Sequence, residues 1–256
     1  VVAGDLLIAT LASDGAPTQT HTTPTGGAAW LPVPRSSGGN LVDIDHGDTA
    51  GVTLSAWYKI AGSSEPATYT FDGSAGEQAV AAVYRISGHD PTTPINASAA
   101  GVGNTTSPVC AAVTTTDADC LLLRIYGADD GDVTNDTGYP ASTTGLFVRP
   151  SAASGLGRCN AGAARSNLAS AGGSGTATFT NVLSSSNQWV GATIAVAPAT
   201  SGDATANPTG VSGTGAVGTP AATGTASTAL TGQSATGSVG TPTASVSETN
   251  SLTGQA

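Results

Sequence analysis

The sequence is short of charge, and the charge that it carries is mostly of one sign. Charged residues make up 9% of the 256 residues, and 17 acidic against 7 basic side chains give a formal net charge of −10. Soluble domains average roughly 25% charged residues. No cluster of lysine or arginine exists, so counterion release cannot drive nucleic-acid binding, and an anionic membrane surface is disfavoured for the same reason. We therefore expect no nucleic-acid partner and no membrane partner.

Lysine, methionine and long apolar segments are scarce as well. Lys59 is the only lysine, and methionine is absent. No apolar run approaches the roughly 18 residues that span a bilayer, and no signal-peptide pattern begins the chain. We expect a processed product or the ordered part of something longer. Glycine, threonine, serine and alanine replace the charged residues, which favours a packed assembly or a secreted fibre over a cytosolic enzyme.

Cysteine is rare, with three residues at Cys110, Cys120 and Cys159. The number is odd and the spacing fits no metal site. A bridge between Cys110 and Cys120 across a hairpin is one interpretation. The interpretation that we prefer is that all three are small buried side chains.

Helical periodicity is nearly absent, whereas strand patterns recur between glycine, aspartate, asparagine and proline. The segment 52–60 alternates, with Val52, Leu54 and Ala56 on one face. Segments 109–113 and 120–126 indicate a hairpin. The predicted strands are 4–12, 52–60, 69–71, 79–86, 109–113, 120–126, 145–148, 175–179 and 189–196. Eight or more strands without a crossover helix predict an all-β fold, an antiparallel β-sandwich or jelly roll, over residues 1–198.

The composition changes beyond Pro198. Residues 201–256 contain no aromatic side chain and no lysine or arginine. The twelve residues from Thr209 return from Thr231 with nine identities, and a third unit opens at Thr253, so the period is 22 residues (231 − 209 = 22). One such unit carries too few apolar side chains to offset its ordering entropy. We predict a β-rich or extended repeat stalk over 199–256, ordered by contact with other copies of the chain, with a trimer favoured. A flexible linker is the alternative.

The densest group of oxygen ligands is formed by Asp129, Asp130 and Asp132, followed by Asp136. Calcium takes six to eight oxygen ligands from such loops, so these are the candidate calcium ligands. The spacing does not match an EF-hand, and turns rich in aspartate are common without a metal. We therefore predict no metal and no other cofactor.

Catalytic motifs are lacking. The three histidines are dispersed, and no serine lies in a Gly-x-Ser-x-Gly elbow. Paired glycosidase carboxylates remain open, because their spacing in sequence is arbitrary. Only Glu65 and Glu77 supply glutamates to the predicted sandwich, and we expect no enzymatic activity.

Aromatic side chains offer a possible sugar-stacking surface. Trp57 lies on the less apolar face of its predicted strand, and Trp30 lies in a loop rich in glycine and proline. These two residues are the candidate ligand-binding residues, whereas Tyr58 is expected in the core. The interpretation that we prefer for both tryptophans is burial under a loop or in a subunit interface.

Several segments together resemble a sandwich module of tailed-bacteriophage structural proteins and of some secreted bacterial proteins. They are GDLLIA (4–9), AWYK (56–59), YTF (69–71) and YRISG (84–88), with Trp30 and the closing Trp189. The repeat is similar to stretches of phage tail and capsid-appendage proteins. The resemblance implies a non-enzymatic structural protein on a virion surface, a capsid decoration or fibre subunit, whose partners are its own copies and other virion or fibre proteins.

Two other hypotheses stay open. One is a secreted bacterial carbohydrate-binding or adhesive module, whose partners would include surface glycans. The other is a polysaccharide-degrading enzyme, which an exposed aromatic row beside a carboxylate pair would favour. The expected location is therefore a virion surface or the extracellular space.

Overall fold

The computed structural model describes residues 1–16, 18–46, 51–74, 76–151 and 157–199, and Val1–Ala199 form one compact unit. The 22-residue repeats lie outside the described residues, so the predicted stalk stays a prediction. The described ranges contain strands and no helix, so no helix among them is long and apolar enough to cross a membrane.

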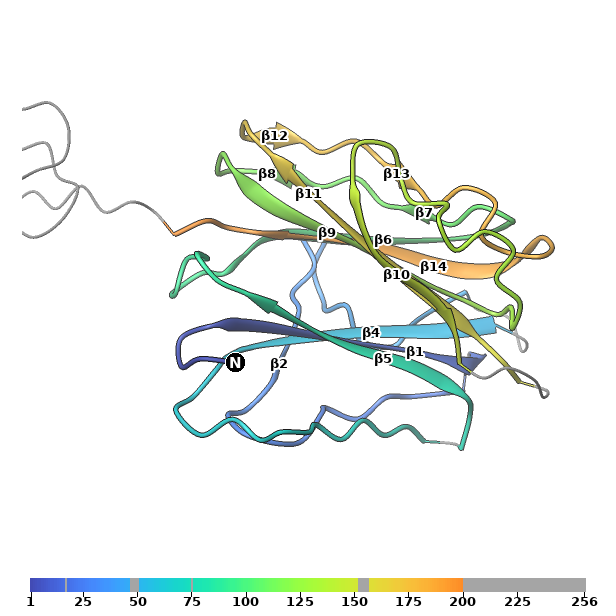
Figure 1. Ribbon diagram of the computed structural model, residues 1–256, viewed down its shortest axis with the longest axis horizontal. Coiled ribbons are helices and arrows are strands. Elements are labelled where there is room, and N and C mark those ends of the chain that lie inside the picture. The colour runs from blue at the N-terminus through green and yellow to red at the C-terminus, as the bar shows by residue number, and fades with distance from the viewer. Residues whose placement is uncertain (17, 47–50, 75, 152–156, 200–256) are drawn as a thin grey trace, which may run out of the picture. The chain divides into compact units, whose positions relative to one another are not determined.

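Residues 6–86 build the first of two five-stranded antiparallel sheets. Its strand order is β2-β4-β1-β5, and β3 also pairs with β4 (Figure 1). The strands are β1 (Leu6–Ala16), β2 (Leu31–Pro32), β3 (Ile44–Asp45), β4 (Gly51–Ile60) and β5 (Ala79–Ile86). We expected β1 to stop before Ser13, but it runs on to Ala16 with an irregular register after Asp14.

Strands between residues 95 and 196 build the second five-stranded sheet, whose strand order is β10-β11-β9-β14-β6. The strands are β6 (Ile95–Thr105), β9 (Cys120–Ala128), β10 (Thr144–Pro150), β11 (Asn160–Leu168) and β14 (Asn187–Val196). The two sheets pack face to face in Figure 1. The predicted all-β, antiparallel sandwich is confirmed.

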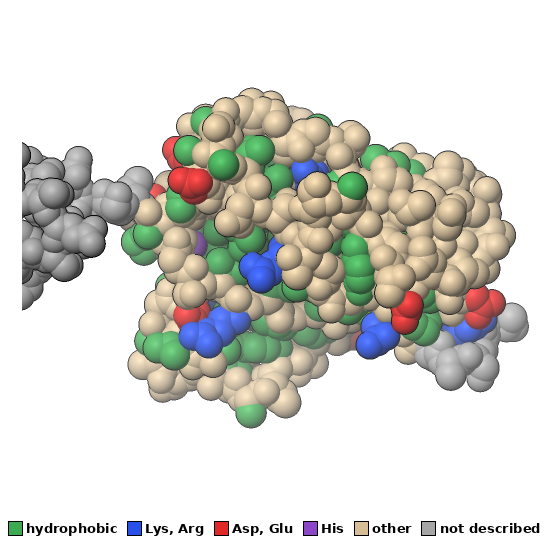
Figure 2. Space-filling model, turned by 45° about the horizontal axis from the view of Figure 1, so that its top comes forward, with side chains coloured by type: hydrophobic (Ala, Val, Ile, Leu, Met, Phe, Trp, Pro, Cys, Tyr) green, Lys and Arg blue, Asp and Glu red, His purple; other side chains and the backbone are tan. Residues whose placement is uncertain are grey.

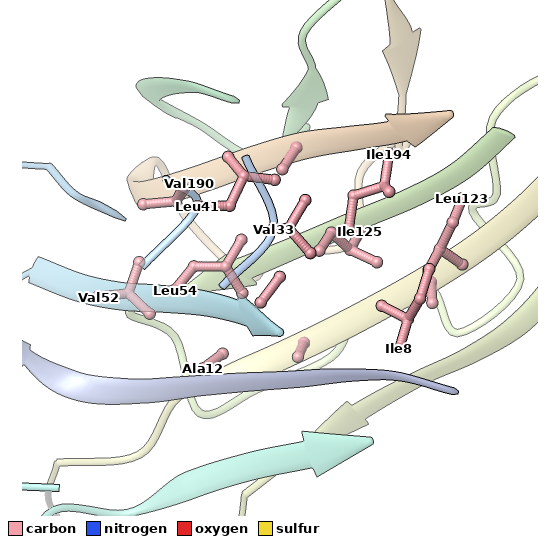
Figure 3. Packing of buried hydrophobic residues seen from close by; sticks show 14 of the residues in the cluster. Ile8, Ala12, Val33, Leu41, Val52, Leu54, Leu123, Ile125, Val190 and Ile194 are labelled. Carbon is pink, nitrogen blue, oxygen red and sulfur yellow. The ribbon is translucent and has the colours of Figure 1, made fainter. Parts of the chain in front are cut away.

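The main core lies between the two sheets. Figure 3 shows Val52 and Leu54 of β4 directed at Ile125 of β9 and Val190 of β14, while Ile8 of β1 meets Leu123. Val52, Leu54 and Ala56 share this inner face, as their alternation predicts. Burial of large aliphatic side chains stabilises such a layer by about 1.5–3 kcal/mol each.

The outer face of the second sheet is also covered. Two short strand pairs lie over it, β7 (Val109–Cys110) with β13 (Ala177–Thr178), and β8 (Thr114–Thr115) with β12 (Gly172–Gly173) (Figure 1). The predicted hairpin of 109–113 with 120–126 is therefore wrong, because β7 pairs with β13 and β9 pairs inside the sheet. Gly191 of β14 permits this covering layer, since a Cβ there would collide with the carbonyl oxygen of Val109.

The outer face of the first sheet is covered by the segments 19–30 and 61–73, which run along the side of β1 and β4 away from the second sheet (Figure 1). These segments contact each other through Thr25 and Thr70, whose backbones exchange hydrogen bonds of 3.1 and 3.3 Å. The predicted strand at 69–71 is thus a single bridge. As a result, β4 is buried on both of its faces.

Candidate functional site

The aspartate-rich loop after β9 uses its carboxylates within the protein. Asp130 accepts hydrogen bonds from the backbone N–H of Ser184 (2.7 Å) and of Asp132 (2.8 Å), and from the Ser184 hydroxyl. Asp132 pairs with Arg158 at 3.0 Å. Asp136 is exposed, and the described residues hold no group of three acidic, histidine or cysteine side chains placed to bind a metal. The candidate calcium ligands point to different partners instead of to one centre.

Asp129 faces another carboxylate. Burial, followed by the charge of Asp14 and a hydrogen bond with it, raises the pKa of Asp129 from 3.8 to about 6. Glu77 lies near the same place, because a Cβ at Gly157 would be 2.9 Å from an Asp14 carboxylate oxygen and 3.6 Å from one of Glu77. The end of the sandwich where β1 and β9 finish therefore concentrates negative charge.

The two candidate tryptophans are buried. Trp57 is 1% exposed and Trp30 is 5% exposed, beneath the segments that cover the first sheet. Neither ring offers a face to a sugar in solution. Trp30 and Trp57 are therefore not sugar-stacking residues, and they form part of the interior beneath the loops. Trp57 is paired with Ala9 on β1, whereas Asp14 is paired with Val52, which places Trp57 and the carboxylate pair at separate places along the strand.

The only lysine is held in a cage beside Trp30. Lys59 donates hydrogen bonds to Glu65 (2.6 Å) and to the carbonyl of Gly26 (2.8 Å), and its ammonium lies 4.5 Å from the ring centres of Trp30 and Tyr69. The Lys59 and Glu65 side chains are 1% and 5% exposed. Burial alone raises the pKa of Glu65, but hydrogen bonds from Lys59, the Gly62 backbone and Tyr69 outweigh it and lower that pKa to about 2. The cage fastens the covering segments to β4.

A buried histidine, His21, lies in the segments that cover the first sheet. Sequence analysis did not predict its contacts. One ring nitrogen of His21 lies 2.7 Å from the Ser13 hydroxyl, and the other lies 2.8 Å from the Ser55 hydroxyl. Ser55 in turn donates to Asp43 over 3.3 Å. Burial lowers the pKa of His21 to about 4, although the charge of Asp43 opposes this, so the ring is neutral at pH 7.

The Ser13 hydroxyl and the His21 imidazole, with Asp43 beyond them, have the chemistry of the relay that activates a nucleophile in hydrolytic enzymes. A substrate, however, cannot reach the hydroxyl. Ser13 is 1% exposed and Ser55 is fully buried. A substrate carbonyl cannot approach a hydroxyl enclosed in this way, because attack requires contact at about 3 Å. The array therefore acts as a polar tie between β1, β4 and the covering loop.

The three cysteines are buried and unbridged, as the preferred interpretation predicts. Cys110 donates to the Ile125 carbonyl and belongs to the outer cluster of the second sheet, whereas Cys120 belongs to a different cluster. Burial raises the pKa of Cys110 to about 12 and that of Cys159 to about 11. All three thiols are protonated at neutral pH.

A groove of about 440 Å³ opens on the outer side of the second sheet, and we call it the outer groove. Its floor is formed by Leu122 and Arg124 of β9 and by Ser166 and Leu168 of β11. Its walls are residues 140–143 before β10 and residues 174, 176–178 and 180 around β13. Sites that bind small ligands typically measure roughly 300–1,000 Å³, so the outer groove is large enough to hold one.

The comparisons with known proteins add no relative. No protein family matches the sequence, and no curated protein or solved structure matches it.

Proposed function

We propose that this chain is a non-enzymatic structural protein of a virion surface, a capsid decoration or a fibre or appendage subunit. In this proposal residues 1–198 form an exposed head and the 22-residue repeats join it to the assembly. The partners are copies of the chain itself and other virion or fibre proteins, and attachment to a host surface is a further role of the head.

The observation that carries the proposal is how the domain uses its few charges. Lys59–Glu65 fastens a covering segment onto the first sheet, and Asp130–Ser184 joins the loop after β9 to the loop before β14. Figure 2 shows few charged side chains on the face in view, several of them as adjacent acidic and basic groups, between large areas of uncharged polar and backbone atoms with scattered hydrophobic side chains. A surface with few charges loses little hydration energy when subunits pack against it, which suits a repeated assembly.

The repeats supply the second line of support. Valine and threonine return in register every 22 residues (231 − 209 = 22), so each position meets its own copies in a symmetric bundle. Three chains together would bury what one unit cannot bury alone. We therefore propose that the full chain is a homotrimer or a higher assembly.

The test compares the full chain with a chain that ends at Ala199, using native mass spectrometry. We expect a trimer or larger species from the full chain and a monomer from the shorter one. A monomeric full chain whose residues 209–256 exchange amide hydrogens at random-coil rates contradicts the stalk.

Gold-labelled antibody against the domain then locates it in particle preparations and in cells from the source of the sequence. Label on virion surfaces is the expected result. Label on cell surfaces or in secreted fibres alone supports the second candidate, a secreted bacterial carbohydrate-binding or adhesive module, which the outer groove with its hydroxyl-lined walls favours.

A further inference from the structure

Arg124 on the floor of the outer groove is a buried cation without an acidic partner. It is only 3% exposed, but unlike Ser13 and Trp30 it lines the outer groove. Its guanidinium donates to the carbonyls of Ala111 (3.3 Å) and Ser174 (3.2 Å) and to the Thr193 hydroxyl (2.6 Å). All three acceptors are uncharged. No aspartate or glutamate among the described residues forms an ion pair with Arg124.

The other titratable group near Arg124 does not neutralise it either. Cys110 is the neighbouring ionisable side chain, and its thiol is protonated because burial raises its pKa to about 12. An arginine stays charged at any pH that proteins experience. A buried charge without a counter-ion is unfavourable, so a carboxylate that reached Arg124 would gain a charge-assisted contact that no group of the described residues supplies.

The guanidinium also has donors to spare. Three of its five N–H groups make the hydrogen bonds given above, and Nε has no partner among the described residues. Charge-assisted hydrogen bonds from arginine to a carboxylate are about twice as strong as neutral ones. Neutral oxygens therefore leave the binding capacity of Arg124 partly unused.

The lining of the outer groove presents unused polar groups. Five lining residues have side-chain hydroxyl groups that form no hydrogen bond with another group in the described part of the chain. They are Ser142, Ser166, Thr176, Thr178 and Thr180. Hydroxyl groups donate and accept hydrogen bonds, so they match the hydroxyl groups of a sugar.

We propose that the outer groove binds a carboxylate-bearing sugar, such as a uronic acid within a polysaccharide, with the carboxylate at Arg124 and the sugar hydroxyls along the walls. The cation selects the acid, and the uncharged polar walls favour a carbohydrate over an acidic peptide, whose apolar and backbone groups would find few matching contacts. The site goes beyond the proposed function, since it does not depend on where the domain is displayed.

The test is isothermal titration calorimetry of the full chain with tri-galacturonate and with its methyl ester. The ester has the same sugar rings and lacks only the charge. We expect a Kd on the order of 1 mM or tighter for the acid and at least about tenfold weaker binding of the ester. Because this assay uses purified protein in solution, its failure leaves the proposal of virion display untouched, and failure of the display test leaves the groove untouched.

A matched pair of variants at the mouth of the groove separates binding from folding. Ser142 has a φ of 59°, a conformation that asparagine and aspartate both adopt readily. Ser142→Asp places a negative charge beside the ligand, so we expect about threefold to tenfold weaker binding of tri-galacturonate. Ser142→Asn brings a side chain of the same size without the charge, so it should bind tri-galacturonate more tightly than Ser142→Asp, and the ratio of the two Kd values isolates the effect of the charge. Arg124→Met should abolish binding, with circular dichroism to check that it folds.

Five outcomes would overturn the proposal. The first three are equal binding of the acid and the ester, equal Kd values for the two Ser142 variants, and no binding of tri-galacturonate at 25 mM NaCl up to about ten times the expected Kd. The fourth is tighter binding of an acidic hexapeptide than of the sugar acid. The fifth is acetate binding as tightly as tri-galacturonate, which would refute contacts with the sugar hydroxyls.

Discussion

The charge of Asp129 costs the folded protein stability at neutral pH. Its pKa rises from 3.8 to about 6 in the folded state because the carboxyl is buried and lies beside Asp14. An acid whose folded pKa lies above its unfolded value binds a proton more tightly when folded. Its contribution to stability is therefore fully present below pH 3.8, and it is lost as the pH rises through about 6.

The magnitude follows from the same two values. A difference of about two pKa units corresponds to about 3 kcal/mol for a fully enclosed group. The Asp129 side chain is only partly buried, so solvent screening reduces this to about 1–2 kcal/mol. Asp129→Asn keeps the shape, removes the charge and still donates a hydrogen bond to Asp14. We expect it to raise the unfolding free energy by about 1–2 kcal/mol at pH 7.5 and by little at pH 4.

The assay is urea unfolding of the full chain followed by tryptophan fluorescence, which suits a domain with three buried tryptophans.

The pH dependence of stability that comes from His21 has the opposite sign. Burial lowers its pKa from 6.5 to about 4, so the stability that it contributes is present above pH 6.5 and is lost as the pH falls through 4. Wild type and variant share that loss, and it cancels in their difference.

Asp136→Asn is the matched control, because it makes the same chemical change in the same loop at an exposed position. It should leave the unfolding free energy within about 0.5 kcal/mol at both pH values. If Asp129→Asn stabilises equally at pH 4 and pH 7.5, or destabilises at pH 7.5, then the carboxylate pair does not set the pKa and the reasoning fails.

Three further predictions concern the covering layers and metal binding. Lys59→Met leaves Glu65 buried without its cation and should lower the unfolding free energy by about 3–5 kcal/mol. Adding Glu65→Gln should recover much of this loss. A double variant no more stable than Lys59→Met would contradict the ion pair as the source of the loss. Gly191→Ala should destabilise the domain by about 1–3 kcal/mol, since its Cβ meets the Val109 carbonyl. The control Gly173→Ala should leave stability unchanged, because a Cβ there meets nothing within 4 Å. Equal effects of the two variants would argue against close packing of β7 on β14. EDTA should leave the melting temperature unchanged, and a drop of several degrees would revive a calcium site in the aspartate-rich loop.

The strands that sequence analysis found are those whose side chains alternate or form apolar runs. β4, β5 and β14 belong to this class, and the structure has them within one or two residues of the predicted bounds. β6 and β11 were missed, because INASAAGVGNT and NAGAARSNL are rich in alanine, glycine and asparagine, which have low β propensity. They are strands because neighbouring strands pair with them and because small residues leave room for rings, as Gly162 does for Tyr126.

The candidate sites were harder to predict than the fold. Alternation placed Trp57 on the face opposite Val52 correctly, but it could not reveal that segments 19–30 and 61–73 cover that face. The outer groove left no local signal, since its lining comes from four separate parts of the chain between residues 122 and 180. The environment of Arg124 likewise depends on Ala111, Ser174 and Thr193, which only the fold brings together.

The order of the strands makes this domain a natural candidate for fragment complementation. All strands of the first sheet precede residue 87 and all strands of the second sheet follow residue 94. A cut between Ile86 and Ile95 would therefore break no pairing between strands, and each fragment would keep one sheet with its own covering loops. The fragments would lose only the covalent connection between the two sheets. The aliphatic layer between the sheets would still drive their association. The part of the domain before residue 87 and the part after residue 94 are thus arranged as the two subunits of a heterodimer would be, joined by one connection of the backbone.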